Sequence, residues 1–271
     1  MPGVTPAPAR SGVVVEIGGV PIRLCADDSG FLNMLQSRYT GFVAPSAPAR
    51  FEFEIDLTSP GSASVDEDVS VKWDSGRWFM ERGDFRAEWN PKTARGKIRQ
   101  AAYPYALDSV LRIVHSLLLA EDGSFLLHAS SAVRNGRAFL FTGVSGAGKT
   151  TMMRLAPPDA TLLTDEISYV KRHGEEFEAF GTPFAGELGR PGENLRAPIA
   201  AVYLLAKGQK NKLEPLRPGD AARALLANIL FFAQDRALVR AVFEAACQFA
   251  SRVPVQRLTF VPDARVWELI G

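Results

Sequence analysis

The 271-residue chain has few of the features that mark several common classes of protein. It holds only two cysteines, Cys25 and Cys247, which are too few for a disulfide framework or a cysteine-based metal site. No uninterrupted apolar run approaches the roughly 18 residues that a membrane-spanning helix needs. Basic and acidic residues nearly cancel, 31 against 30, so neither nucleic acid nor a membrane surface is indicated as a partner. These absences favour a protein of the reducing cytoplasm.

The first residues, MPGVTPAPARSG, lack the apolar core of a signal peptide, and we expect residues 1–12 to be a disordered tail. Hydrophobic residues make up 46% of the chain and charged residues 23%, which is ordinary for a soluble globular protein. The length suffices for one large domain or two modest ones.

Residues 13–104 show the pattern of short strands separated by turns. VVVEI and VPIRLC flank Gly18-Gly19, a hairpin signal, and residues 30–42 place apolar side chains at helical spacing, with Gly41 able to end that helix. FEFEIDL alternates apolar and acidic residues, and VSVKW, RWFME, FRAEW and GKIRQ follow between turn-forming residues. This pattern predicts an antiparallel meander with one buried face. Because no titratable cluster with catalytic spacing occurs here, we expect a β-rich α+β domain that covers or docks a substrate.

From residue 105 the apolar residues recur with a helical period. ALDSVLRIVHSLLLA predicts an amphipathic helix whose polar face carries Asp108, Arg112 and a solvated His115. FLLHASSAV and RAFLFTG predict two strands joined by the turn RNG, and further strands and helices follow to the C-terminus. We therefore expect residues 105–271 to form an α/β domain that carries the chemistry.

The segment GVSGAGKT, residues 143–150, matches the phosphate-binding pattern G-x-x-x-x-G-K-[ST] without a mismatch. Glycines let successive backbone N–H groups turn towards phosphate oxygens, and the N-terminus of the following helix adds positive potential. Lys149 would bridge the outer phosphates, and the Thr150 hydroxyl would ligate Mg²⁺. The predicted cofactors are ATP or GTP with Mg²⁺. The predicted nucleotide-binding residues are Gly143, Val144, Ser145, Gly146, Ala147, Gly148, Lys149, Thr150 and Thr151.

An acidic pair, Asp165-Glu166, begins only sixteen positions after Lys149. Pro157-Pro158 leaves room for about two helical turns before the strand ATLLT, so loop, helix and strand form a compact crossover. If the two strands lie parallel and side by side, both carboxylates emerge next to the phosphates. One carboxylate can hold Mg²⁺ and the other can accept the proton of an attacking hydroxyl. Successive residues leaving a strand point to opposite sides, so the pair should divide these roles.

Together with LLHASSAV before the loop, this spacing resembles the kinase domain of the HPr kinase/phosphorylase family, which is itself similar to the nucleotide core of ATP-dependent phosphoenolpyruvate carboxykinases. That family shows a histidine in the strand before the loop, a G-x-S-G-x-G-K-[ST] loop and an Asp-Asp pair. Here these are His128, residues 143–150 and Asp165-Glu166, and the resemblance covers residues 125–170 well. It implies a compact P-loop kinase domain with Asp165 as general base for an acceptor serine. It also implies that Glu166, with Thr150 and Asp165, supports Mg²⁺, and that His128 lines the phosphate site.

The chain also departs from the family pattern. Its second carboxylate is Glu where the family has Asp, and a later family signature is recognisable only as GELGR, in which Glu187 and Arg190 are candidates for substrate or phosphate contacts. GTPFAGE is typical of a divergent branch that occurs with clusters for ribosomally made modified peptides, where some members phosphorylate a peptide serine. The resemblance therefore implies a peptide or small-protein acceptor. The family forms rings, and the different first half of this chain leaves a homo-oligomer as an open option.

Four functions are compatible with these residues. The leading hypothesis is an ATP-dependent serine kinase in which the loop, Lys149 and Mg²⁺ act on the phosphates and Asp165 acts on the nucleophile. The second is a P-loop ATPase or nucleotide-dependent switch in which Glu166 polarises water. The third is a module that binds ATP without turning it over, and the fourth is a kinase of small molecules.

Overall fold

The computed structural model describes residues 10–59 and 68–270, so most of the predicted tail, residues 1–9, lies outside the described residues. The chain divides into two compact units, residues 1–107 and 108–271. This division falls in the first turn of helix α2 (Pro104–Glu121), close to the start of the α/β domain that the sequence analysis placed at residue 105. No helix in the described ranges is long and apolar enough to cross a membrane.

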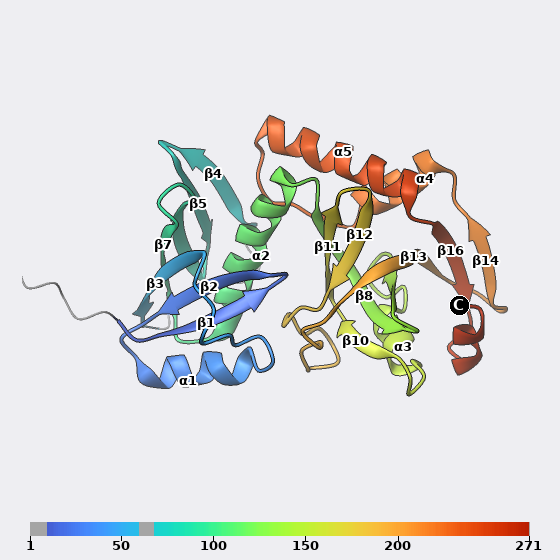
Figure 1. Cartoon of the computed structure of the whole chain (residues 1–271), viewed down its shortest axis with the longest axis horizontal. Helices are drawn as coiled ribbons and strands as arrows, with labels where there is room; N and C mark the ends of the chain where they lie inside the picture. The colour runs from blue at the N-terminus through green and yellow to red at the C-terminus, as the bar shows by residue number, and fades with distance from the viewer. Residues whose placement is uncertain (1–9, 60–67, 271) are drawn as a thin grey trace, which may run out of the picture. The chain divides into compact units, whose positions relative to one another are not determined.

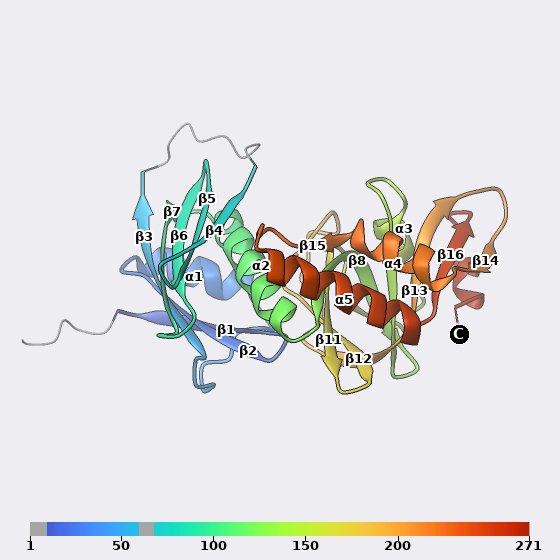
Figure 2. The ribbon, with the colours of Figure 1, turned by 90° about the horizontal axis from the view of Figure 1, so that it is seen from above.

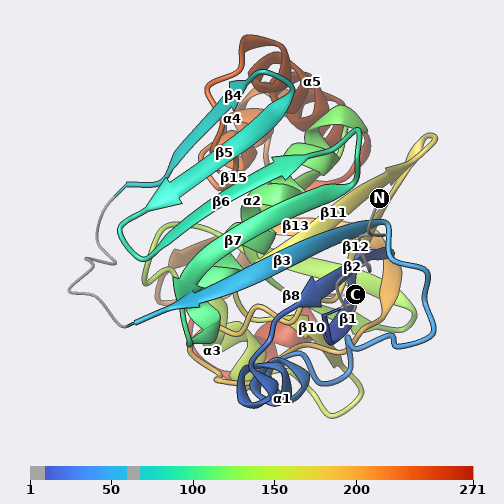
Figure 3. The ribbon, with the colours of Figure 1, turned by 90° about the vertical axis from the view of Figure 1, so that its left-hand side faces the viewer.

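Over its described residues, the first unit holds a seven-stranded sheet in the order β1-β2-β3-β7-β6-β5-β4 (Figure 3). Its elements are β1 (Gly12–Ile17), β2 (Val20–Cys25), α1 (Ser29–Arg38), β3 (Phe51–Thr58), β4 (Ser70–Asp74), β5 (Arg77–Arg82), β6 (Phe85–Asn90) and β7 (Arg95–Ala101). The predicted hairpin is confirmed, because β1 and β2 pair antiparallel around Gly18 and Gly19, whose φ angles of 60° and 74° suit a type I′ turn. The predicted helix is α1, which Asp28 caps by accepting the N–H of Phe31 at 2.7 Å.

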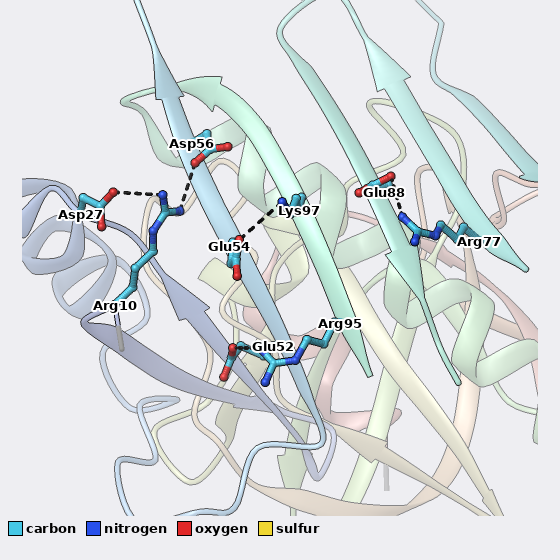
Figure 4. Close-up of polar contacts among 9 residues, drawn as sticks. All are labelled: Arg10, Asp27, Glu52, Glu54, Asp56, Arg77, Glu88, Arg95 and Lys97. Carbon is cyan, nitrogen blue, oxygen red and sulfur yellow. Dashed lines mark hydrogen bonds and ion pairs between the residues drawn. The ribbon is translucent and has the colours of Figure 1, made fainter. Parts of the chain in front are cut away.

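The predicted meander is correct for only four strands. Strands β4 to β7 pair antiparallel in sequence order, but β3 lies between β2 and β7 and pairs with both in parallel. A physical reason lies on the solvent-exposed face, where the acidic positions of β3 stand opposite Arg95, Lys97 and Arg99 of β7. Ion pairs join Glu52 to Arg95 and Glu54 to Lys97 (Figure 4). Cross-strand pairs of opposite charge contribute about 0.2–1 kcal/mol each and favour this partner strand.

The opposite side of the β3–β7 pair contains a close approach between Phe53 and Gly96. These two residues are direct partners in the parallel register. A Cβ atom on Gly96 would lie 2.3 Å from a carbon of the Phe53 ring, so the ring occupies the space that any larger residue would need. Phe53 is fully buried there.

In the described part of the second unit, a nine-stranded sheet has helices on both faces (Figure 1). Its elements are β8 (Phe125–Arg134), β9 (Arg137–Thr142), α3 (Lys149–Arg154), β10 (Thr161–Thr164), β11 (Ile167–His173), β12 (Glu176–Phe180), β13 (Arg196–Lys207), β14 (Lys212–Pro215), α4 (Pro218–Leu226), β15 (Ile229–Leu230), α5 (Arg236–Arg252), β16 (Val255–Phe260) and the 3-10 helix η1 (Ala264–Glu268). Strand β9 shows the layering. Leu140 packs into a cluster with residues of α4 and α5, which lie side by side (Figure 2). Phe139 and Phe141 pack into a second cluster with Met152 of α3 and Trp267 of η1.

Strand β8 has four neighbours. Its first half pairs with β11 and β15, and its second half lies between β9 and β10. The expectation that β9 and β10 are adjacent parallel strands is therefore wrong. Both run antiparallel to β8, which separates them, so they still point the same way. Their last residues, Thr142 and Thr164, lie opposite Ala129 and Ser131 of β8, and the residues that follow leave from one edge of the sheet.

The segment between β12 and β13 is closed onto β10. The N–H of Thr182 donates to the carbonyl oxygen of Leu163 at 3.0 Å, and the N–H of Glu193 donates to that of Leu162 at 2.9 Å. A Cβ atom on Gly192 would lie 1.7 Å from the carbonyl oxygen of Leu163. Only glycine allows the returning chain to pass this close to β10, and the segment from 182 to 193 is thereby held as a closed loop.

The polar face predicted for α2 is wrong in one respect, because its titratable residues are not solvated. Asp108 is 3% exposed and His115 is fully buried, with its ring 5.5 Å from that of Tyr169 in an edge-on contact. Ile113 and Leu119, which do not belong to the predicted apolar positions 107, 110, 111, 114, 117 and 118, are buried as well. A helix that is apolar around most of its circumference is an internal helix. The apolar residues at helical spacing had indicated an amphipathic helix instead.

The contact at Gly192 gives a stability prediction. Gly192→Ala is expected to lower the free energy of unfolding by about 2–4 kcal/mol, because the new methyl group requires the backbone at Leu163 to move. Gly219→Ala is the matched control, since nothing lies within 4 Å of a Cβ atom at that position near the start of α4. Urea unfolding followed by circular dichroism measures both variants. Equal midpoints for the two would contradict the close approach at β10.

Candidate functional site

A cavity of about 250 Å³ opens beside the glycine-rich loop. Its walls come from β8, the loop after β9, the first turn of α3, the end of β10 and the closed loop that follows β12. The lining residues are His128, Ser145, Gly146, Gly148, Lys149, Thr150, Thr151, Asp165, Glu166, Gly186 and Glu187. Lys149 of the glycine-rich loop and Asp165 of the acidic pair thus line one cavity together with His128.

The backbone of the glycine-rich loop requires its glycines. Gly143, Gly146 and Gly148 have φ angles of 149°, 73° and 111°, a region that residues with side chains rarely adopt. A Cβ atom on Gly148 would also lie 2.6 Å from the ring of Phe260 at the end of β16. At the first position of α3, the Lys149 ammonium group donates to the carbonyl oxygen of Gly143 at 3.1 Å, so the side chain folds back along the loop.

Not every residue predicted to bind nucleotide faces this cavity. Six of them, from Ser145 to Thr151 with the exception of Ala147, line it. Ala147 is buried, whereas Val144 is 79% exposed, and neither of them nor Gly143 belongs to the lining. Any contact that these three make with a ligand would go through the backbone or lie outside the cavity.

Asp165 connects the end of β10 to the closed loop. Its side chain is nearly inaccessible, at 3% exposure for the residue, and its two carboxylate oxygens accept the N–H groups of Gly186 and Leu188 at 2.8 and 2.7 Å. A carboxylate oxygen has two lone pairs, so each retains one acceptor position. The closed loop is therefore anchored to the Asp165 side chain.

Glu166 is paired with Arg112, a residue that was not expected in the site. Its Oε2 accepts a hydrogen bond from Nη2 of Arg112 at 2.8 Å, and the Arg112 guanidinium carbon lies 4.9 Å from the centroid of the Phe184 ring. The Nε atom of Arg112 is buried without a hydrogen bond to any described residue. Arg112 was expected on a solvated polar face of α2, and that expectation hid its place in the site.

The electrostatics of the cavity keep His128 neutral. Burial lowers the pKa of His128, and the nearby cations Lys149 and Arg112 lower it further. Burial also lowers the pKa of Lys149, which the carboxylates of Glu166 and Glu187 oppose. Positive and negative groups are thus mixed in this cavity, and a neutral imidazole can serve as a hydrogen-bond partner at neutral pH.

The two candidates from GELGR differ in position. Glu187 lines the cavity, whereas Arg190 is exposed and does not belong to the lining. No three His, Cys, Asp or Glu side chains of the described residues are placed to hold a metal ion by themselves. The lining nevertheless offers the oxygen atoms of Thr150, Asp165 and Glu166. Mg²⁺ usually binds one or two protein carboxylates, and water and phosphate oxygens complete its coordination shell. The oxygen atoms of these three residues fit that requirement.

A larger cavity of about 560 Å³ lies in the first unit, and four of the charged residues that line it form two ion pairs, Arg82 with Asp84 and Arg86 with Glu81. Arg82 donates to both oxygens of Asp84, at 2.6 and 2.8 Å, and the Tyr103 hydroxyl donates to the same carboxylate at 2.8 Å. Burial and this carboxylate raise the pKa of Tyr103 to about 12. Arg82, Asp84 and Tyr103 thus form a partly buried structural network.

These observations define a mixed α/β protein with two multi-stranded sheets and a glycine-rich strand–loop–helix turn that faces paired carboxylates. The sequence model of the family described as SynChlorMet cassette protein ScmC matches residues 105–271, more than half of the chain. The chain therefore belongs to the ScmC family.

Comparison with solved structures finds a weaker similarity. The chain resembles the Hpr(Ser) kinase/phosphatase from Coxiella burnetii at 13% sequence identity and a TM-score of 0.32, with 54% of this chain and 85% of that chain covered. A similarity of this size is too weak to carry an argument about activity. A search of the curated proteins gives no match.

The charge arrangement around His128 gives a prediction about its titration. Arg112→Gln is expected to raise the pKa of His128, because one of the two cations that lower it is removed. Since the folded-state pKa lies below the ordinary value of about 6.5, the unfolded chain binds the proton first, and this group costs stability as the pH falls below that value. This loss of stability at low pH should be smaller in Arg112→Gln than in the wild type. NMR titration of the three histidines measures the shift, with the exposed Arg137→Gln as control. An unchanged pKa in Arg112→Gln would place Arg112 away from His128.

Proposed function

We propose that this protein is an ATP-dependent kinase that transfers the γ-phosphoryl group to a serine hydroxyl of a peptide or small protein. One observation carries the proposal: the glycine-rich loop with Lys149, and the paired residues Asp165 and Glu166, line the same cavity although they come from separate strands. This combination of a phosphate-binding turn, a cation and two carboxylates suits phosphoryl transfer, where positioning and charge neutralisation supply most of the catalysis.

In this proposal the loop amides and Lys149 bind the β- and γ-phosphates. Thr150 and Glu166 hold Mg²⁺, which neutralises charge on the phosphate oxygens when bound. Asp165 accepts the proton of the acceptor hydroxyl, whose oxygen bonds to the γ-phosphorus as the bond to the β–γ bridging oxygen breaks and ADP leaves. The neutral His128 donates a hydrogen bond to a phosphate oxygen.

The acceptor is proposed from the family rather than from the cavity. The match to a SynChlorMet cassette protein supports a peptide or small protein as the acceptor. The HPr kinase-like motifs support serine as the accepting residue. The β-rich first unit is proposed to dock this acceptor. GTP as the nucleotide and a homo-oligomer stay open.

A second candidate function is nucleotide hydrolysis, which one observation favours. Both oxygens of Asp165 already accept backbone N–H groups, whereas Oε1 of Glu166 makes no hydrogen bond to the residues that the structure describes. Glu166 is therefore the more available carboxylate for polarising a water molecule. The two functions differ in where the γ-phosphoryl group goes.

The experiment uses γ-labelled ATP with Mg²⁺, the purified protein and a small-peptide fraction from the native host. Label is expected on a discrete peptide, with more than 100-fold less transfer for Asp165→Asn. Lys149→Ala is expected to lose tight Mg·ATP binding, because the cation on the outer phosphates is removed. Arg137→Gln, at the start of β9, is the exposed control.

Melting temperatures separate catalytic loss from unfolding, because Asp165 also anchors the closed loop. Full transfer by a folded Asp165→Asn would remove Asp165 as the base. Label found only as free phosphate, and reduced in Glu166→Gln, would replace the kinase by the hydrolase.

A further inference from the structure

Three parallel strands of the second unit end at one edge of the sheet. Strand β13 pairs in parallel with β9 on one side and with β16 on the other. Lys207 and Phe260, the last residues of β13 and β16, pair with each other, and Thr142 at the end of β9 pairs with Leu204, three residues before the end of β13. All three strands therefore end on the same side of the sheet. In open α/β sheets ligands bind outside the carboxyl ends of such strands. The glycine-rich loop leaves from β9, and the segments that follow β13 and β16 lie on the side of β9 away from Asp165.

Two hydrogen bonds and one close ring contact join these three segments. Gly148 of the glycine-rich loop lies against the ring of Phe260, where a Cβ atom would come within 2.6 Å. The N–H of Gly208 donates to the carbonyl oxygen of Phe260 at 3.2 Å. The N–H of Val261 donates to Oδ1 of Asn211 at 2.9 Å. The segments after β13 and β16 are thus tied to each other, and the second is in contact with the loop.

A cavity of about 430 Å³ lies between these two segments. One wall is formed by Gln209, Lys210 and Asn211, and the other includes Val261, Asp263 and Leu269. Strand β16 is two strands from β9, roughly 10 Å at about 4.8 Å per strand, a span that a ribose can bridge between phosphates and a base.

The chemistry of the walls suits a flat heteroaromatic ring. Val261 and Leu269 supply apolar surface, and Leu269 is among the exposed large apolar side chains. Because the backbone of Val261 occupies Oδ1 of Asn211, the Nδ2 group of that amide is left as a donor, and Gln209 supplies a second exposed amide. Asp263 is paired with Arg265 at 2.6 Å, and the two other charged residues of the lining, Lys210 and Glu268, are of opposite sign, so the cavity has no excess charge that would demand a charged ligand.

We propose that this cavity binds the purine base of the nucleotide whose phosphates occupy the glycine-rich loop, with Gln209 and Asn211 contacting the polar edge of the ring. The proposal rests on the phosphate site of the proposed function and is independent of the acceptor. In this proposal the segments after β13 and β16 contribute to nucleotide affinity and determine which base is bound, although neither segment belongs to the glycine-rich loop or the acidic pair.

The test compares two ligands by isothermal titration calorimetry of the full chain: Mg·ATP and Mg·tripolyphosphate, which has the phosphates without the nucleoside. Wild type is expected to bind ATP at least tenfold more tightly than tripolyphosphate. Gln209→Ala and Leu269→Arg are expected to reduce that ratio at least threefold while leaving the affinity for tripolyphosphate unchanged. Gln209 and Leu269 are exposed, so both variants should fold, and the exposed Gln234→Ala is the matched control.

Lys149→Ala separates this proposal from the phosphate site, because it should weaken both ligands together. Equal affinity of wild type for ATP and tripolyphosphate would overturn the base site and leave the phosphate site standing. An unchanged ratio in both Gln209→Ala and Leu269→Arg would also overturn it. Failure of wild type to bind either ligand would overturn the base site and the proposed function together.

Discussion

Strand β8 pairs along its length with four other strands, and the candidate site depends on that sharing. Its second half separates β9 from β10 and so brings the ends of both strands to one edge. His128 lies at the change of neighbours, where its N–H donates to Asn228 and its carbonyl oxygen accepts the Thr142 hydroxyl at 2.8 and 2.9 Å. A strand fixed by hydrogen bonds on both sides cannot slip without turning its side chains to the other face. The backbone of the sheet therefore fixes the position from which the imidazole enters the cavity.

The site combines rigid backbone with balanced charge. The amides that hold Asp165 come from a loop that is itself closed onto β10, so strand and loop constrain each other. Glu166 is shared electrostatically between Arg112, its hydrogen-bonded partner, and Lys149, whose pKa it helps to keep up. A polyanion entering the cavity would compete with Glu166 for both cations. Such pre-arranged charges cost little reorganisation when a ligand binds, which is the physical basis of electrostatic catalysis.

The sequence predicted local features better than pairings. Alternation, helical periodicity and turn residues identified the β1–β2 hairpin, α1 and the strand–loop–helix turn, because these depend on neighbouring residues. The parallel placement of β3 and the insertion of β8 between β9 and β10 depend on partners distant in the chain, which periodicity does not specify. Arg112 was missed for the same reason: its relation to Glu166 spans 54 positions and needs the packed fold. The roles assigned to the two domains and to the site residues stay predictions.

In the pairing of β3 with β7, the charged residues leave more than one possible alignment of the two strands, and a glycine decides between them. Acidic residues recur on β3 at every second position, and basic residues do so on β7. Sliding one strand by two residues would therefore still match most of the opposite charges, so the ladder alone has several nearly equivalent alignments. Only one alignment sets the Phe53 ring against Gly96, where the space is free. The charges thus favour β7 as the partner strand of β3, and the space that Gly96 leaves for the Phe53 ring fixes the register between them.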